Sequence, residues 1–300
     1  MRRSLALIVG AAILLAGCGS STPSAGSASA SGKYGDKPTI TFNGSAPKAL
    51  VTTVLLKGTG PVVAKGDLLV ADYLGQIWGG KVFDNSYDRR VPAGFPIGIG
   101  AVVPGWDKSL VGQTAGSRVL LTLPPSEAYG ATGNTNAGIK GTDTIVFVVD
   151  IISSYSGKVG GDPNAVAQKL PADIPIVAGT PGGKPKITIP KGLKAPTKQR
   201  LVTLALGTGP KINAGMVVFQ YEAIDWTGKA DGSTWTSGQP TTASIGSKTA
   251  PSILNGLIGL PIGSRVLVEV PAATGQAAAA AVVDIVAQPL TAQATAATAG

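Results

Sequence analysis

The hydrophobic and polar positions of this 300-residue chain form short, β-branched runs bounded by Gly, Pro and Asp. Partly alternating runs of this kind predict β-strands. Those of the first half lie within residues 48–155 and read V-T-T-V-L-L, L-L-V-A-D-Y-L-G-Q-I-W, R-V-L-L-T-L and D-T-I-V-F-V-V-D-I-I. Between two of them, P-G-W-D-K-S-L-V-G predicts a short helix, because Pro104 suits a first helical turn and Gly112 suits a stop. A short helix lying across an antiparallel sheet gives an α+β domain.

The second half of the chain repeats the first half in order. G-T-G at 58–60 recurs at 207–209, and G-S-R-V-L at 116–120 recurs at 263–267. Between these pairs, Tyr73 and Trp78 recur as Tyr221 and Trp226, and V-V-D-I follows in both halves. The spacing between the copies shrinks slowly along the chain, which indicates a duplicated domain with small insertions and deletions.

The N-terminus carries the pattern of a bacterial lipoprotein signal. Arg2 and Arg3 form a positive n-region, residues 5–14 form an apolar h-region, and L-A-G-C ends in Cys18, the residue that would be acylated. An ordinary signal peptide would not need a cysteine there, and the apolar run is short for a membrane anchor. The sequence therefore predicts an extracytoplasmic protein that is anchored to the cell membrane through lipidated Cys18.

Cysteine and histidine usage excludes several kinds of site. Cys18 is the only cysteine and would be consumed by lipidation, and the chain has no histidine. Ser-His triads, Cys-His pairs and most zinc sites are therefore excluded, so neither a metal nor a cofactor is expected. The formal net charge is +9. Because the lysines are scattered and no aromatic residues lie between them, a solvated basic surface explains this charge better than nucleic-acid binding does.

Composition divides the rest of the chain. Residues 19–38 are rich in Ser, Ala and Gly, which predicts a flexible tether. Residues 156–196 have little apolar periodicity and read as a linker, with short ordered pieces around Val177 and 187–189. The predicted layout is a signal peptide (1–17), lipidated Cys18 with a tether (18–46), a first domain (47–155), a linker (156–196), a second domain (197–288) and a disordered tail (289–300).

A set of mainly aromatic and aliphatic residues, with one pair of opposite charges, follows in order through the first domain. The set is Tyr73, Phe83, Asp84, Arg89, Phe95, Val102, Val103, Trp106, Tyr129, Ile139 and Phe147. Taken singly, each would be core packing or a surface ion pair. In order and spacing, however, the set resembles the FKBP-type peptidyl-prolyl cis-trans isomerases over about residues 47–154. The resemblance implies an α+β fold of two tandem FKBP-like domains, each a twisted antiparallel β-sheet wrapped on a short α-helix.

The resemblance also implies a role for each residue. The catalytic set would be Tyr73, Phe83, Asp84, Trp106, Tyr129 and Phe147, with Trp106 as the pocket floor and Tyr129 as a hydroxyl donor to a carbonyl. The substrate-binding set would be Arg89, Phe95, Val102, Val103 and Ile139, with the Val103 N–H on a substrate carbonyl and Ile139 in a loop that closes over the pocket. Three positions depart from the family pattern, namely Ala93, Ala101 and the loop 134–141 without its usual proline pair. These departures affect macrolide affinity and substrate preference more than activity.

The second domain keeps the sheet and helix residues but not those of the pocket. In the expected alignment, the replacements are Trp235 for Phe83, Thr236 for Asp84, Ala243 for Phe95, Ile253 for Trp106 and Ala281 for Phe147, with nothing opposite Tyr129. This pattern predicts a folded but non-catalytic copy.

The function implied is peptidyl-prolyl isomerisation that assists the folding of exported proteins at the outer face of the cytoplasmic membrane. Its partners would be proline-containing exported polypeptides, with macrolide inhibitors as a further candidate and no nucleic acid. Two alternatives stay open. One is a non-catalytic FKBP-like module that binds proline segments or acts as a chaperone. The other is a solute-binding lipoprotein, which no bilobal α/β pattern supports.

Overall fold

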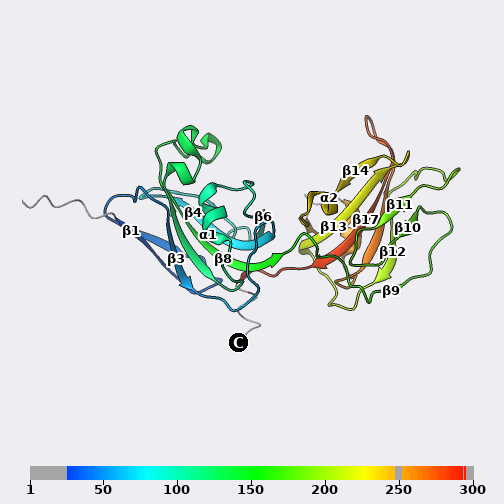
Figure 1. The fold of residues 1–300 in the computed structure, drawn as a ribbon, viewed down its shortest axis with the longest axis horizontal. Helices are drawn as coiled ribbons and strands as arrows, with labels where there is room; N and C mark the ends of the chain where they lie inside the picture. Colours follow the sequence, from blue (N-terminus) through cyan, green and yellow to red (C-terminus); the bar gives the residue numbers. More distant parts are fainter. Residues whose placement is uncertain (1–25, 247–251, 293, 295–300) are drawn as a thin grey trace, which may run out of the picture.

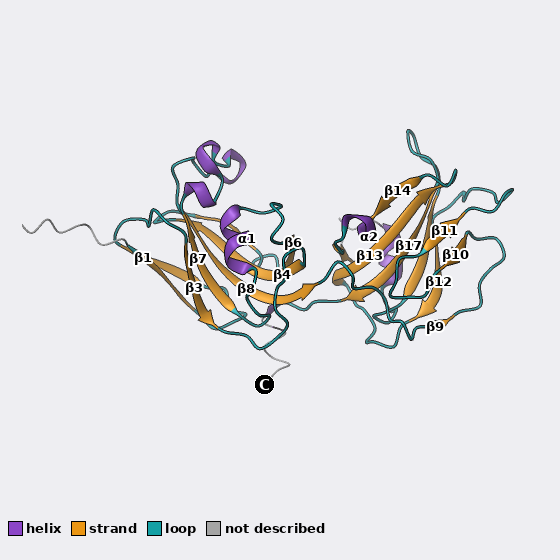
Figure 2. Ribbon diagram, viewed as in Figure 1, coloured by secondary structure: helices purple, strands orange, loops and turns teal. Residues whose placement is uncertain are grey.

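The computed structural model describes residues 26–246, 252–292 and 294. The predicted signal peptide, the lipidated Cys18 and the last residues of the predicted tail lie outside the described residues. Most of the described chain is strand and loop, with few helices (Figure 2). Within the described ranges, no helix is long and apolar enough to cross a membrane.

The first half of the chain forms a six-stranded antiparallel sheet with the strand order β3-β7-β8-β4-β5, and β6 pairs with β4. Its strands are β3 (Val51–Leu56), β4 (Leu68–Ile77), β5 (Val82–Asn85), β6 (Ala93–Pro96), β7 (Arg118–Leu123) and β8 (Ile145–Tyr155). All four runs identified in the sequence therefore form strands. Three short 3₁₀ turns, η1 (Pro125–Glu127), η2 (Gly130–Thr132) and η3 (Thr135–Ala137), lie between β7 and β8.

The helix α1 (Pro104–Leu110) forms at the predicted place. Pro104 occupies its first turn, where the missing N–H costs nothing, and Gly112 follows its end with a φ of 88°. The side chains of Trp106 and Leu110 extend from the helix into the hydrophobic core on the sheet, where both are buried. This packing places the start of α1 over the strands that carry the candidate site.

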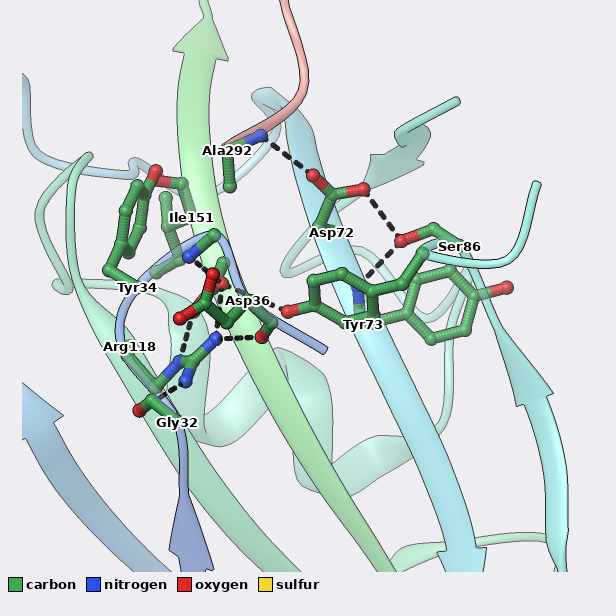
Figure 3. A network of polar contacts seen from close by, with 12 residues as sticks. Gly32, Tyr34, Asp36, Asp72, Tyr73, Ser86, Arg118, Ile151 and Ala292 are labelled. Carbon is green, nitrogen blue, oxygen red and sulfur yellow. Dashed lines mark hydrogen bonds and ion pairs between the residues drawn. The ribbon is translucent and has the colours of Figure 1, made fainter. Parts of the chain in front are cut away.

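A hairpin covers the opposite face of this sheet. Its strands are β1 (Ser27–Ser31) and β2 (Thr39–Asn43), which pair antiparallel. Ile40 packs against Leu74 and Leu120, and the hairpin turn is held by Arg118, whose guanidinium donates to the Gly32 and Asp36 carbonyls, both at 2.7 Å (Figure 3). The expectation of a flexible tether over 18–46 is therefore wrong for residues 27–43, because tertiary contacts fix a segment that is rich in small residues.

The second half forms a seven-stranded sheet with the order β14-β13-β17-β16-β12-β9, and β15 pairs with β13. Apart from the added edge strand β9 (Val166–Ala167), this is the order of the first sheet. Its remaining strands are β12 (Arg200–Leu206), β13 (Gly215–Asp225), β14 (Ala230–Ser233), β15 (Thr241–Ile245), β16 (Arg265–Val270) and β17 (Ala279–Ala287). A helical turn α2 (Thr234–Ser237) follows β14, and the 3₁₀ helix η4 (Ser252–Leu257) precedes β16 at the position that corresponds to α1.

The segment 156–196 is not a free linker. It contains a second hairpin, β10 (Ile176–Ala178) and β11 (Lys186–Thr188), at the ordered pieces expected around Val177 and 187–189. Ile187 packs on the second sheet, and Arg265 donates to the carbonyls of Gly179 at 3.0 Å and Gly183 at 2.5 Å. Arg118 holds the first hairpin in the same way. Each sheet therefore carries its own hairpin on the outer face.

The two sheets meet through the first residues of β4 and β13. Leu68 and Val70 of β4 pack with Met216 and Val218 of β13 in one buried cluster. The long strand β8 leads from the first sheet towards the second (Figure 1). The chain then returns after β17, and Ala292 lies fully buried with its N–H 2.7 Å from Asp72 Oδ2 of β4. The predicted disordered tail is therefore wrong at its start, because residues up to 292 are tied to the first half.

Candidate functional site

A cavity of about 470 Å³ opens on the helix side of the first sheet. Its lining is mainly aromatic and aliphatic, with the carboxylate of Asp84 at the rim. The lining residues are Tyr73, Phe83, Asp84, Phe95, Ala101, Val102, Val103, Pro104, Trp106, Ala128, Tyr129 and Phe147. Nine of the residues singled out in the sequence thus come together from four strands, one helix and two loops.

Trp106 forms the floor of this cavity. Its ring centre lies 4.8 Å from that of Phe95, 5.1 Å from that of Phe147 and 5.9 Å from that of Tyr73, and all three pairs are edge-on. Phe83 in turn meets Phe147 edge-on at 5.6 Å. Edge-on rings are a favourable arrangement for quadrupoles, so the walls hold one another in place.

The two walls Phe83 and Phe147 need a glycine beneath them. A Cβ on Gly75 of β4 would come within 2.6 Å of Phe83 and 2.7 Å of Phe147. Gly75 pairs with both strands that carry these rings, since it lies opposite Asp84 on β5 and opposite Phe147 on β8. The absence of a side chain at Gly75 is therefore what allows the rings to lie over the sheet.

The polar rim is a three-residue network. The Tyr73 hydroxyl donates to Asp84 Oδ2, and Arg89 donates to Asp84 Oδ1 at 2.5 Å and to the Tyr73 hydroxyl oxygen at 2.8 Å. Burial, together with the hydrogen bond to Asp84, raises the pKa of Tyr73 to about 12, so its hydroxyl remains a donor. Partial burial opposes ionisation of Asp84, but the hydrogen bonds from Tyr73 and Arg89 prevail and lower its pKa. The rim therefore presents a fixed carboxylate beside an apolar cavity.

The loop that carries Val102 and Val103 is pinned to α1. Asp107 in the first turn of α1 accepts hydrogen bonds from the N–H of Gly98 at 2.6 Å and of Gly100 at 2.7 Å. On the other side of the cavity, Lys108 pairs with Glu127 of η1 at 2.6 Å, which ties the Tyr129 segment to the same helix. Both loops around the opening are thus positioned by one short helix.

Two predicted residues do not line the cavity. Arg89 does not line the cavity itself and is joined to it through Asp84 and Tyr73. Ile139 is 2% exposed in the core, and its backbone N–H and C=O both pair with Asn134. Ile139 therefore does not line the cavity, and the closure of its loop over the pocket stays a prediction. Ala101, Pro104 and Ala128 also line the cavity, although the sequence marked Ala101 only as a departure from the family pattern and Pro104 only as a helix start.

The comparison with known proteins agrees with this geometry. The family profile for FKBP-type peptidyl-prolyl cis-trans isomerases matches residues 60–152. FK506-binding protein 2 of Yarrowia lipolytica is 39% identical over 30% of this chain and 61% of its own length. The chloroplastic isomerase FKBP13 of Arabidopsis thaliana is 40% identical over 33% of this chain and 50% of its own length. The chain therefore spans only about half to three fifths of these two relatives.

A shorter relative is matched almost completely. The FK506-binding protein of Streptomyces anulatus is 34% identical over 120 residues, which cover 39% of this chain and 97% of that protein. The chain belongs to the FKBP family. The antiparallel sheets and scarce helices fit this fold, and the cavity of the first half lies within the FKBP match.

The second half keeps Tyr221 at the place of Tyr73 but differs at other positions that form the FKBP cavity. In β14, Gly232 pairs with Ala223, whereas in the first half Asp84 pairs with Gly75. The register also places Thr234, which bonds the Tyr221 backbone N–H at 2.7 Å, where Ser86 bonds the Tyr73 N–H. The expected alignments of Trp235 with Phe83 and of Thr236 with Asp84 are therefore wrong by several residues.

Two other expected replacements are confirmed by the pairing of the strands. Ala243 on β15 lies opposite Val217, as Phe95 on β6 lies opposite Leu69. Ala281 lies opposite Ala223, as Phe147 lies opposite Gly75. The second sheet thus lacks both the carboxylate and two of the aromatic walls.

Proposed function

We propose that the first half of this chain is a peptidyl-prolyl cis-trans isomerase that acts on proline-containing polypeptides. The observation that carries the proposal is the aromatic cavity with Trp106 as its floor and the Tyr73–Asp84–Arg89 network on its rim. The relatives that carry isomerase names support it.

This reaction needs no nucleophile, metal or titrating base. The barrier to rotation is the lost resonance of the C–N bond, about 20 kcal/mol. The planar amide has more charge separation than the twisted one, so water favours the planar form, and a dry aromatic cavity lowers the barrier by binding the twisted form better. The proline ring would lie on Trp106, and the Tyr129 hydroxyl and the Val103 N–H would hold substrate carbonyls.

The rim would act on the twisting amide electrostatically. The carboxylate of Asp84 is fixed by two donors and held ionised, so it requires no reorganisation when the amide rotates. Arg89 holds that carboxylate and the Tyr73 hydroxyl in fixed positions relative to each other. Arg89 would thus be a positioning residue of the rim rather than a contact of the proline.

We further propose that the chain is a tandem of two FKBP-like domains, of which the second has lost catalysis. The matching strand orders and the two arginine-held hairpins support the duplication. Gly232, Ala243 and Ala281 at the places of Asp84, Phe95 and Phe147 support the loss. The second domain would then serve the first as a structural neighbour.

The proposed location is the outer face of the cytoplasmic membrane, with anchoring through lipidated Cys18 and exported polypeptides as substrates. The sequence pattern around Cys18 supports it. Macrolides of the FK506 type are candidate ligands, since relatives are named for binding FK506.

The competing function is a module that binds a proline segment without useful turnover. Exchange broadening of the cis and trans signals of a proline tetrapeptide in NMR spectra distinguishes the two. Catalysis predicts broadening at substoichiometric protein concentrations. Binding without turnover predicts shifts of the peptide signals that saturate at stoichiometric amounts, with no accelerated exchange.

A further inference from the structure

The interface between the two halves joins corresponding elements. Leu68 and Val70 of β4 pack against Met216 and Val218 of β13, the strands that hold the same place in each sheet. On the neighbouring strands, Gly94 lies opposite Val70 and Thr242 lies opposite Val218. A Cβ on Gly94 would come within 2.9 Å of Thr242 Cγ2, so these two corresponding residues also meet. The contact therefore has the self-complementary form of a two-fold dimer interface, built within one chain.

Each half also receives a segment from beyond the last strand of the other. In the second half, Gln220 of β13 is fully buried and donates to the carbonyls of Gly157 and Val159, both at 3.0 Å. In the first half, Asp72 of β4 is 2% exposed and accepts the N–H of Ala292 at 2.7 Å. The exchange is reciprocal, but only the first half uses a carboxylate.

That carboxylate is linked to the pocket rim. Asp72 Oδ1 accepts the hydroxyl of Ser86 at 2.7 Å, and the same Ser86 oxygen accepts the Tyr73 backbone N–H at 2.9 Å (Figure 3). Ser86 is fully buried and lies in the short segment between Asp84 and Arg89. Its position therefore sets where the two charged rim residues stand relative to the Tyr73 hydroxyl.

Hydrogen bonds on both oxygens compensate the burial of the Asp72 carboxylate. A buried charge is costly unless hydrogen bonds satisfy it. One oxygen of Asp72 is satisfied by Ser86 and the other by Ala292, so the returning C-terminal segment completes the network. Without that segment, Asp72 Oδ2 would lose this donor, and the strand would favour conformations that let the carboxylate reach water.

We propose that Asp72, held by the C-terminal segment around Ala292, is a positioning residue for the pocket rim, so that the second half acts as an intramolecular partner of the first site. The proposal rests on the isomerase function proposed above. It gives the non-catalytic half a defined task, which is to fix the Asp84–Arg89 segment through Asp72 and Ser86.

The test compares Asp72→Asn with the matched variant Gln220→Met in the full chain. Asn keeps an oxygen for Ser86 but presents an amide N–H₂ to the Ala292 N–H. Gln220→Met releases the 157–159 segment from the second half, which bears no rim. Hydrogen exchange at Ala292 and at Val159 reports whether each segment is freed, and isomerisation kinetics on a proline tetrapeptide report on the rim.

We expect Asp72→Asn to speed exchange at Ala292 and to lower kcat/KM roughly threefold to tenfold, mainly through kcat. Gln220→Met should speed hydrogen exchange at Val159 and leave both kcat and kcat/KM within about twofold of the values for the unmodified chain. Ala292→Pro, which removes the N–H donor and leaves the first half unchanged, should reproduce the kinetic loss even if Asp72→Asn folds poorly.

Unchanged kinetics in a chain whose Ala292 N–H is freed would overturn the proposal, and so would unchanged exchange at Ala292 in Asp72→Asn. Equal kinetic losses in Asp72→Asn and Gln220→Met would reduce the effect to general loosening and would also overturn it. Absence of turnover in the unmodified chain would instead defeat the isomerase function. In that case, the dissociation constant of the same peptide, measured for each variant, would still decide whether Asp72 positions the rim.

Discussion

Replacement of Trp106 tests the floor of the cavity most severely. Trp106→Ala removes three edge-on ring contacts, each worth about 0.5–1.5 kcal/mol beyond the buried area. Truncation of a buried Trp typically costs about 3–5 kcal/mol in the free energy of unfolding. Because the void would join a cavity that already opens to solvent, water can enter it, and we expect a loss near the lower end, about 3 kcal/mol.

Trp106→Phe is the matched control. The Trp106 indole N–H is buried and has no hydrogen-bond partner among the described residues, so its removal relieves an unsatisfied donor. Phe also keeps a ring beside Phe95 and Phe147, and we therefore expect a loss of about 1 kcal/mol or less. Urea unfolding of the full chain, followed by far-ultraviolet circular dichroism, measures both. A loss under about 1 kcal/mol for Trp106→Ala, or equal losses for the two variants, would refute this description of the floor.

Three further outcomes are expected. Cys18→Ser should leave uncleaved precursor or release soluble protein, and wild-type fractionation and migration would contradict the lipoprotein assignment. Because the folded-state pKa of Asp84 is lowered, its ion pair persists through the ordinary carboxyl range and is lost only as pH falls through the lower folded-state value. Turnover at about pH 5 should therefore equal that at pH 7, and a decline already at pH 5 would contradict it. Arg118→Met leaves Asp150 buried without its partner and should cost about 3–5 kcal/mol in urea unfolding. Lys37→Met, which breaks the exposed ion pair with Asp88, should cost clearly less than Arg118→Met, and equal losses for the two variants would contradict the importance of the buried ion pair.

The strands, the helix and most of the cavity could be predicted because their residues are both patterned and chemically distinct. Leu, Val, Ile and aromatic residues form apolar, partly alternating runs along β4, β7 and β8, and Pro104 and Gly112 mark the helix. The lining was predictable because its residues follow, in order and spacing, the pattern of the FKBP-type isomerases. Ala128 was missed, and Ala101 was not expected in the lining, because a small side chain gives no signal of the space beside it.

The two hairpins were not predictable from local sequence. S-A-S-A-S in β1 has small, polar side chains, which are equally typical of a flexible tether. Its strand form depends on Arg118 and on the apolar face beneath Ile40, both far away in the chain. The prediction of disorder at the start of the tail was wrong for the same reason, because the burial of Ala292 depends on Asp72.

The alignment of the two pockets failed for a different reason. Matching Trp235 to Phe83 by ring type ignored the backbone register. The structure fixes that register through the side chain of Thr234, which caps the Tyr221 backbone as Ser86 caps that of Tyr73. The residue that replaces the Asp84 carboxylate in the second half is therefore Gly232 rather than the expected Thr236.

In the proposed function, isomerisation occurs in the first pocket and nowhere else in the chain. The direct measurement is prolyl isomerisation of a tetrapeptide by the full chain and by the double variant Asp84→Ala, Tyr129→Phe, with urea unfolding as the control for folding. Both substitutions lie at the cavity rim, so the fold should remain. We predict clear catalysis by the unmodified chain and a rate near that of the uncatalysed peptide for the folded double variant. Unchanged turnover in that folded variant would place the activity elsewhere and contradict the account.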